Sequence, residues 1–159
     1  MDTTIRPYAP RDREAVTALA LHAWEPGYLA MARNLGERLF ERVVGDWREA
    51  HRRDVQADLD ADEVGVWVAV TDTVAGFVTV KLDRAEHIGE IHMIAVDPDQ
   101  QNRGVGSALT AFAVEHMREE GMSIAHVNTG GDPGHAPARA TYEKAGFTAL
   151  PAVNYFKHI

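Results

Sequence analysis

A glycine-bearing turn between a predicted strand and a predicted helix is the part of this sequence best suited to chemistry. It reads Gln101-Asn102-Arg103-Gly104-Val105-Gly106-Ser107. A turn of this kind presents unpaired backbone N–H groups and the positive end of the helix dipole, which together suit a pyrophosphate. The two glycines let phosphate oxygens approach the backbone, and Arg103 offers a forked, charged donor. An ordinary tight strand-to-helix turn explains the same glycines, so the segment alone leaves both interpretations open.

The sequence does not match other motifs for phosphate binding, nucleophilic catalysis or metal ligation. A P-loop requires Gly-Lys followed by Ser or Thr, whereas Gly106 is followed by Ser107 and Ala108. The dinucleotide fingerprint requires a third glycine at the position of Leu109. The sequence contains no cysteine, and its 8 histidines lack the paired spacing of metal ligands. We therefore expect neither a cysteine nucleophile nor a metal site.

The pattern of apolar residues before the turn predicts two helical stretches. The first helix begins after Asp12 and ends at Pro26, because proline cannot continue the helical hydrogen bonds. The second begins near Leu35 and continues or kinks beyond Gly45 to Leu59.

Segments rich in β-branched and aromatic residues predict the strands, and two more helices separate them. The first two strands form a hairpin with a bulge at Gly76. In order, the expected elements are strands 64–70, 74–82 and 88–96, helix 105–120, strand 123–128, helix 137–145, and a terminal strand pair, 147–150 and 153–158. Strand, helix and strand over residues 88–128 form one βαβ unit with parallel strands and a right-handed crossover. The sequence therefore predicts the α/β class with a mixed sheet.

Length and composition set the remaining bounds. The chain has 159 residues, of which 45% are hydrophobic and 25% are charged. This length and composition predict one globular domain over residues 1–159. The formal net charge of −8 disfavours nucleic acid and anionic lipid as partners. The first ten residues do not read as a signal peptide, and we see no stretch apolar enough to span a membrane. We expect a cytoplasmic protein.

Two segments of the sequence resemble the GNAT acetyltransferase superfamily. Residues 101–106 match its acyl-CoA pyrophosphate signature, which is Gln or Arg, two free positions, Gly, one free position, and Gly or Ala. Downstream, Tyr142-Glu143-Lys144-Ala145-Gly146-Phe147 is similar to a second common element of that family. The resemblance covers the chain from about Val64 onward and implies a mostly antiparallel, splayed sheet with helices on both faces.

The resemblance also implies where acetyl-CoA binds. It places the pantetheine arm along the backbone of Ile94, Ala95 and Val96, and the pyrophosphate against the amides of residues 101–107. Where the family often has an asparagine that contacts CoA, this sequence has His135. His135 either donates a hydrogen bond to CoA or caps the helix near Pro137.

Acetyl transfer to an amine also requires proton transfer. A lysine-like amine is protonated at pH 7, a deficit of about 4.6 kcal/mol that a base must offset. By resemblance Glu90 stands at the position of a general-base glutamate, and His92 lies two residues on, facing the same side. Either one acts directly or through water. Tyr142 matches the family's general acid, although protonating a thiolate from a tyrosine is uphill by about 2 kcal/mol, so it serves as an acid or as a hydrogen-bond donor.

We therefore expect an acetyl-CoA-dependent N-acetyltransferase that works by direct attack in a ternary complex. The acceptor is a primary amine of a small molecule or peptide, and the acidic chain mildly favours a cationic one. Aromatic residues in the first third of the chain either line the acceptor pocket or pack the core: Trp24, Tyr28, Phe40 and Trp47. The alternative is a CoA-binding sensor without turnover, and a homodimer remains open.

Overall fold

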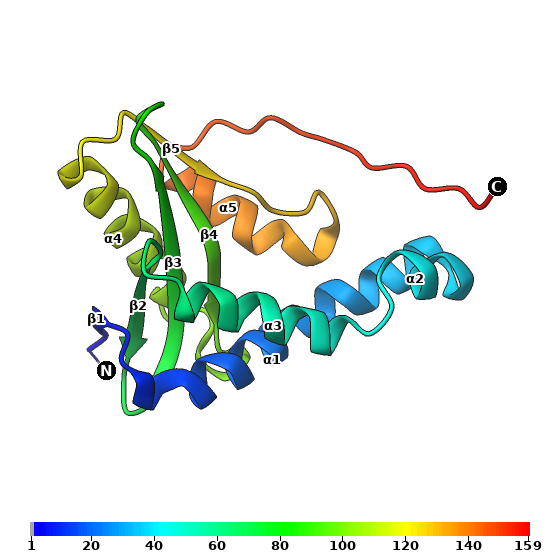
Figure 1. Ribbon diagram of the computed structural model, residues 1–159, viewed down its shortest axis with the longest axis horizontal. Helices are drawn as coiled ribbons and strands as arrows, with labels where there is room; N and C mark the ends of the chain where they lie inside the picture. Colours follow the sequence, from blue (N-terminus) through cyan, green and yellow to red (C-terminus); the bar gives the residue numbers. More distant parts are fainter. Residues whose placement is uncertain (1) are drawn as a thin grey trace.

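The computed structural model describes residues 2–159 and contains a five-stranded mixed sheet (Figure 1). The strands lie side by side in chain order: β1 (Thr4–Pro7), β2 (Gly65–Val70), β3 (Val74–Asp83), β4 (Ile88–Val96) and β5 (Ile124–Val127). Strands β1 to β4 pair with one another in antiparallel fashion, and β5 runs parallel to β4. The predicted α/β class, the hairpin and the parallel βαβ pair are confirmed.

Helices cover both faces of the sheet (Figure 1). They are α1 (Arg13–Leu35), α2 (Glu37–Val43), α3 (Trp47–Asp60), α4 (Val105–Glu119) and α5 (Ala136–Lys144). On one face, α4 buries Val105, Leu109 and Ala113 against the strands. On the other face, α1 and α3 bury Val16 and Val55 against Phe77 and its neighbours. The alternation of side chains along each strand supplies both cores.

The first helix is longer than predicted, because α1 continues past Pro26 to Leu35. Pro26 cannot donate a hydrogen bond to the carbonyl of His22, one turn earlier. Both residues are exposed, so that carbonyl is open to solvent and the helix can continue through Pro26. The prediction that α1 ends at Pro26 was wrong.

The second helical stretch breaks rather than kinks. Gly36 and Gly45 have φ of 76° and 66°, left-handed conformations that end α1 and separate α2 from α3. Asp46 then starts α3 by accepting a hydrogen bond from the amide of Glu49 at 3.2 Å. Strand β1 was not predicted, because four residues that pair only at the sheet's edge carry little periodicity.

The predicted terminal strand pair is absent. Residues 148–159 adopt no strand or helix and are all exposed, and Figure 1 shows them running away from the sheet. A two-residue hairpin turn would fall on Pro151-Ala152. The favoured hairpin turns need a positive φ at their first central residue, whereas proline holds φ near −65°. The sequence thus lacks the turn that the predicted pair required.

Candidate functional site

The glycine turn lies at the N-terminus of α4, after the 3₁₀ turn Pro98–Gln100. Gly104 precedes the helix with φ of 80°, a left-handed conformation that favours glycine. Within residues 2–159, no side chain caps this end, and the first turn of α4 carries no acidic group. The amides of residues 105–107 therefore lack helical acceptors and remain available to a ligand.

The space in front of this helix end is open. A Cβ added at Gly104 would meet no atom within 4 Å, and one added at Gly106 would meet only the side chain of Val96, at 3.6 Å. Arg103 is exposed, and its Nη1 donates to Oε1 of Gln100 at 3.1 Å, which holds the guanidinium at the rim. Exposed amides, a helix dipole and a guanidinium fit the pyrophosphate of CoA.

Of the other residues predicted to contact the pyrophosphate, Gln101, Asn102 and Ser107 are exposed. Val105 is 2% exposed, so only its backbone amide is available to a ligand.

Strands β4 and β5 pair over only part of their length. The register joins Ile88 to Ile124 and ends where Ile91 meets Val127. Beyond Ile91 the edge of β4 has no partner from β5, so the sheet opens there. The three residues predicted to contact the pantetheine arm, Ile94, Ala95 and Val96, lie along this unpaired edge. Strand β4 ends at Val96, and the glycine turn follows at residues 101–107.

A bulge in β4 places His92 at the start of this opening. Thr79 pairs with Met93 and Val80 with Ile91, so His92 is the extra residue opposite β3. The amide of Met93 donates to Oγ1 of Thr79 at 2.9 Å. The bulge is therefore held by a side-chain hydroxyl as well as by backbone pairing.

His92 is anchored by a buried carboxylate that the sequence analysis missed. Asp58 lies on α3 and is 4% exposed. Its Oδ2 lies 2.6 Å from Nδ1 of His92 and accepts a hydrogen bond from Thr79 at 2.7 Å. Lys81 adds a positive charge, with Nζ 3.7 Å from Oδ1.

This arrangement defines which nitrogen of the His92 ring faces the carboxylate of Asp58. A carboxylate only accepts hydrogen bonds, so the hydrogen of this contact lies on Nδ1 of His92, and in the neutral form of the ring Nε2 keeps its lone pair. The side chain of His92 is 32% exposed, so the ring is only partly enclosed. A neutral imidazole oriented in this way by a buried carboxylate is suited to accept a proton.

Glu90 lies on the same face of the sheet as His92, as predicted. It pairs in register with Lys81, whose side chain points to Asp58 on that face. The side chain of Glu90 is 40% exposed, and Nδ1 of His126 on β5 lies 3.8 Å from its Oε2. The side chain of Glu90 is therefore less firmly held by its neighbours than that of His92.

Tyr142 lies on α5 and is 9% exposed. Its ring meets that of Phe147 edge-on, with centroids 5.9 Å apart, and Phe147 donates its amide to the carbonyl of Tyr142 at 3.0 Å. Burial raises the pKa of the Tyr142 phenol. The hydroxyl thus stays protonated and is suited to donate a hydrogen bond rather than to release its proton.

His135 occupies the N-cap position of α5, but its side chain makes no capping hydrogen bond, and its Nδ1 lies 2.6 Å from Oδ1 of Asp132. The expectation that the side chain caps the helix was therefore wrong. The ring lies against α1, where a Cβ on Gly27 would meet Cε1 of His135 at 3.2 Å. Burial opposes ionisation of Asp132, but its hydrogen bond with His135 holds the pKa of that carboxyl below the usual range. His135 thus braces the loop before α5 on α1.

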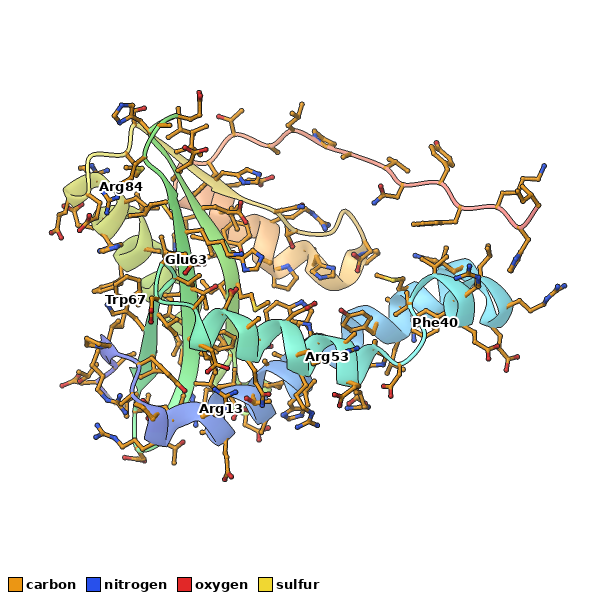
Figure 2. The ribbon with its side chains drawn as sticks, viewed as in Figure 1. Arg13, Phe40, Arg53, Glu63, Trp67 and Arg84 are labelled. Atoms are coloured by element: carbon orange, nitrogen blue, oxygen red, sulfur yellow. The ribbon has the colours of Figure 1, made fainter. Side chains whose placement is uncertain are left out.

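Three of the four candidate acceptor-wall aromatics cluster between α1 and α3. Tyr28 stacks on Trp47 at 4.4 Å, and Trp24 lies 4.7 Å from the ring of His51. His51 is 6% exposed, Nε2 has no partner in the described part of the chain, and burial lowers the pKa of its ring. Phe40 lies apart on α2, away from the sheet (Figure 2).

Residues 2–159 contain no group of three or more histidine, aspartate or glutamate side chains that could hold a metal ion. None of the helices in the same range is both long and apolar enough to cross a membrane.

Comparison with known proteins points to one family. The family model described as the acetyltransferase (GNAT) family matches residues 14–147. Mycothiol acetyltransferase of Saccharomonospora viridis is 32% identical over 156 residues, covering 92% of this chain and 46% of that protein. The enzyme of the same name from Actinosynnema mirum is 31% identical over 151 residues, covering 93% of this chain and 45% of its own. The chain thus spans about half the length of these relatives.

Solved structures share the fold at lower identity. The PaiA N-acetyltransferase of Thermoplasma acidophilum, solved with coenzyme A, superposes with a TM-score of 0.72 at 18% identity, covering 96% of this chain and 94% of that one. AAC(6')-Iy with a bisubstrate analogue gives a TM-score of 0.67 at 19% identity, covering 100% and 99%.

Proposed function

The chain belongs to the GNAT acetyltransferase family, and we propose that it transfers acetyl from acetyl-CoA to the primary amine of a small molecule or peptide. One observation carries the proposal. The N-terminus of α4 presents uncapped backbone amides, and the unpaired edge of β4 that precedes it begins beside an oriented imidazole. The helix end suits a pyrophosphate and the imidazole suits a base, and acetyl transfer needs both.

In this proposal, acetyl-CoA binds along the unpaired edge of β4 and against the N-terminus of α4. The amides of residues 101–107 and the Arg103 guanidinium hold the pyrophosphate, and the free edge of β4 at Ile94, Ala95 and Val96 carries the pantetheine arm. His135 is a further contact to CoA from the loop before α5. An amide at the edge of β4, by the family resemblance that of Ile94, polarises the thioester carbonyl.

We propose His92 as the base. Nε2 takes a proton from the acceptor amine, whose nitrogen lone pair forms the new bond to the acetyl carbonyl carbon. The carbon–sulfur bond then breaks, and the Tyr142 hydroxyl donates a hydrogen bond to the departing sulfur. His92 is favoured over Glu90 because Asp58 fixes its ring, whereas Glu90 has one distant partner. Glu90 remains the competing candidate.

The acceptor is proposed to be a small polar molecule. The two relatives described above are mycothiol acetyltransferases, and one structural neighbour is an aminoglycoside acetyltransferase solved with sisomicin. A chain of net charge −8 attracts a cationic amine over one of neutral or negative charge. We propose that the reaction takes place in the cytoplasm. Disulfides are typical of proteins in oxidising compartments, and this chain has no cysteine with which to form one.

Thiol release from acetyl-CoA across a panel of amines tests the proposal. A thiol reagent reads the released CoA, and the protein contributes no background because it contains no cysteine. Release that depends on one class of amine supports N-acetyl transfer. Acetyl-CoA that raises the Tm without release from any amine would contradict transfer and favour a sensor.

Matched variants test the two assigned regions. Gly104→Asp and Gly104→Asn both tolerate a positive φ and differ by one charge, so the aspartate should weaken acetyl-CoA binding more than the asparagine. For the base, His92→Gln and Glu90→Gln are compared with His126→Gln on β5. A larger loss of kcat in Glu90→Gln than in His92→Gln would assign the base to Glu90.

A further inference from the structure

A buried threonine on β3 joins the two features that hold His92 in place. Thr79 is 0% exposed, and its hydroxyl bonds to both β4 and α3. Oγ1 accepts a hydrogen bond from the amide of Met93 at 2.9 Å and donates one to Oδ2 of Asp58 at 2.7 Å. One hydroxyl therefore contacts the backbone next to His92 and the carboxylate that orients its ring.

The chemistry of the two neighbours fixes the direction of both bonds. The amide of Met93 can only donate, so it uses a lone pair of the hydroxyl oxygen. The carboxylate of Asp58 can only accept, so the hydroxyl hydrogen of Thr79 points to it. This position needs a group that donates and accepts at once, which an apolar side chain of the same shape cannot supply.

The place of Thr79 in the sheet makes these contacts possible. The register shift that leaves His92 as the extra residue of β4 falls directly after Thr79. Lys81 lies two residues further along β3, on the same face, with Nζ 3.7 Å from Oδ1 of Asp58. Each oxygen of this carboxylate thus has a partner from β3, and Oδ2 also contacts Nδ1 of His92.

Loss of the hydroxyl would leave two buried groups short of a partner. The amide of Met93 would lose its acceptor, and the carboxylate of Asp58 would lose one of its donors, in residues that are both buried. A buried polar group without its partner is costly, so the surrounding structure shifts to satisfy it. The bulge and the carboxylate would both become free to move, and the position of His92 depends on both.

We propose that Thr79 is a positioning residue for His92, acting through the backbone of the bulge and through Asp58. It is fully buried, so it contacts no substrate itself. The proposal rests on the proposed function in one respect, the role of His92 as the base. Proton transfer requires the base to lie within hydrogen-bond reach of the amine, and a ring that turns freely spends less time in that geometry.

Matched variants separate the hydroxyl from the packing. Thr79→Val keeps the shape of the side chain and removes the hydroxyl, whereas Thr79→Ser keeps the hydroxyl and removes a methyl group. Thr79→Val should lower kcat about tenfold, close to the lower value of one hydrogen bond to a charged group, with the KM for acetyl-CoA near wild type. Thr79→Ser should retain most of kcat. Equal kcat values for the two variants would overturn the proposal.

Two further comparisons guard this result. Thr17 is also buried, but its hydroxyl donates to the carbonyl of Arg13 within α1, so Thr17→Val removes a buried hydroxyl and should leave kcat unchanged. If Thr79→Val does not fold at the assay temperature, Thr79→Ala is compared with Thr79→Ser. These two variants also differ by the hydroxyl alone, and the same loss of kcat is expected in Thr79→Ala.

Combination with His92→Gln tests whether Thr79 acts through His92. In that background, Thr79→Val should cause no further loss of kcat, because the side chain that it positions is already absent. The same fold loss in both backgrounds would mean that Thr79 acts on the reaction by another route, and this result overturns the proposal.

A spectroscopic readout separates this proposal from acetyl transfer itself. Nitrogen NMR of protein labelled at its histidines reports which ring nitrogen carries the hydrogen, and the His92 signals are identified by their loss in His92→Gln. At a pH where the ring is neutral, wild type should carry the hydrogen on Nδ1, and Thr79→Val should share it between both nitrogens. That result without thiol release from any amine would retain the positioning role and reject the proposed function. A His92 ring unchanged by Thr79→Val would overturn the positioning role, even in an enzyme that turns over.

Discussion

The hydrogen bond between Asp58 and His92 leads to the sharpest prediction about this protein. Asp58→Asn keeps the size of the side chain but removes its charge. The amide oxygen of asparagine, placed where Oδ2 of Asp58 lies, can still accept from both Thr79 and Nδ1 of His92, so the ring keeps its orientation. The negative charge that stabilises the imidazolium formed when His92 takes a proton is lost.

The size of the effect is bounded by the charged hydrogen bond that is replaced by a neutral one. A hydrogen bond to a charged group contributes about 1.5–3 kcal/mol. At about 1.4 kcal/mol for each factor of ten, kcat should fall about 10- to 100-fold. The KM for acetyl-CoA should stay near the wild-type value, because Asp58 lies on α3 and the proposed CoA path lies along β4 and α4.

The assay is steady-state thiol release with the amine that the panel identifies. Asp60→Asn is the matched control, because it removes one carboxylate from the same helix but from an exposed pair with Arg13. Thermal unfolding verifies that Asp58→Asn is folded at the assay temperature. An acceptor whose own pKa lies below the assay pH is already neutral and should show a smaller defect than a basic acceptor.

Two results would refute this reasoning. If Asp58→Asn lost no more activity than Asp60→Asn, the buried carboxylate would have a structural role only. If the loss were equal for basic and weakly basic acceptors, the dyad would not supply a base.

Three further predictions concern the stability of the fold and the role of Tyr142 in the reaction. Gly76→Ala places a methyl group 2.7 Å from a backbone oxygen of β4 and should cost about 1–3 kcal/mol, whereas Gly131→Ala, with nothing within 4 Å, should cost little in thermal unfolding. The hydrogen bond from Arg6 lowers the pKa of Asp12, so this carboxylate stabilises the fold above its unfolded pKa and loses that effect as the pH falls through its folded value. Urea unfolding should therefore show a gap between wild type and Asp12→Asn at pH 7 that narrows below about pH 4, and a constant gap would contradict this. Tyr142→Phe should lower kcat about 10- to 100-fold, the value of one hydrogen bond to a charged group, with little change in Tm; an unchanged kcat would remove Tyr142 from the mechanism.

Asp58 illustrates which part of the site could not be predicted. His51, Val55 and Asp58 share the buried face of α3, and a carboxylate on such a face signals a paired charge. That signal does not identify the partner. His92 is 34 residues away on a bulged strand, and one residue more or less in the bulge would turn it to the other face.

Local physics explains what could be predicted from the sequence. The glycine turn, the helix after it and the parallel βαβ pair depend on neighbouring residues, namely the φ of Gly104, the apolar period and the crossover rule. The predictions that were wrong concern segments whose conformation depends on solvent exposure or on distant parts of the chain. The helix α1 passes Pro26 at a solvent-exposed position, and residues 148–159 form no strand.

The sequence by itself therefore determined the elements, their order and the turn suited to phosphate, because these follow from short-range periodicity and backbone geometry. Only the tertiary structure decided how far β4 and β5 pair, which carboxylate orients His92 and which sheet edge stays open. Each of these depends on contacts between segments far apart in the chain, and such contacts are set by how the two cores pack on the sheet rather than by any local pattern.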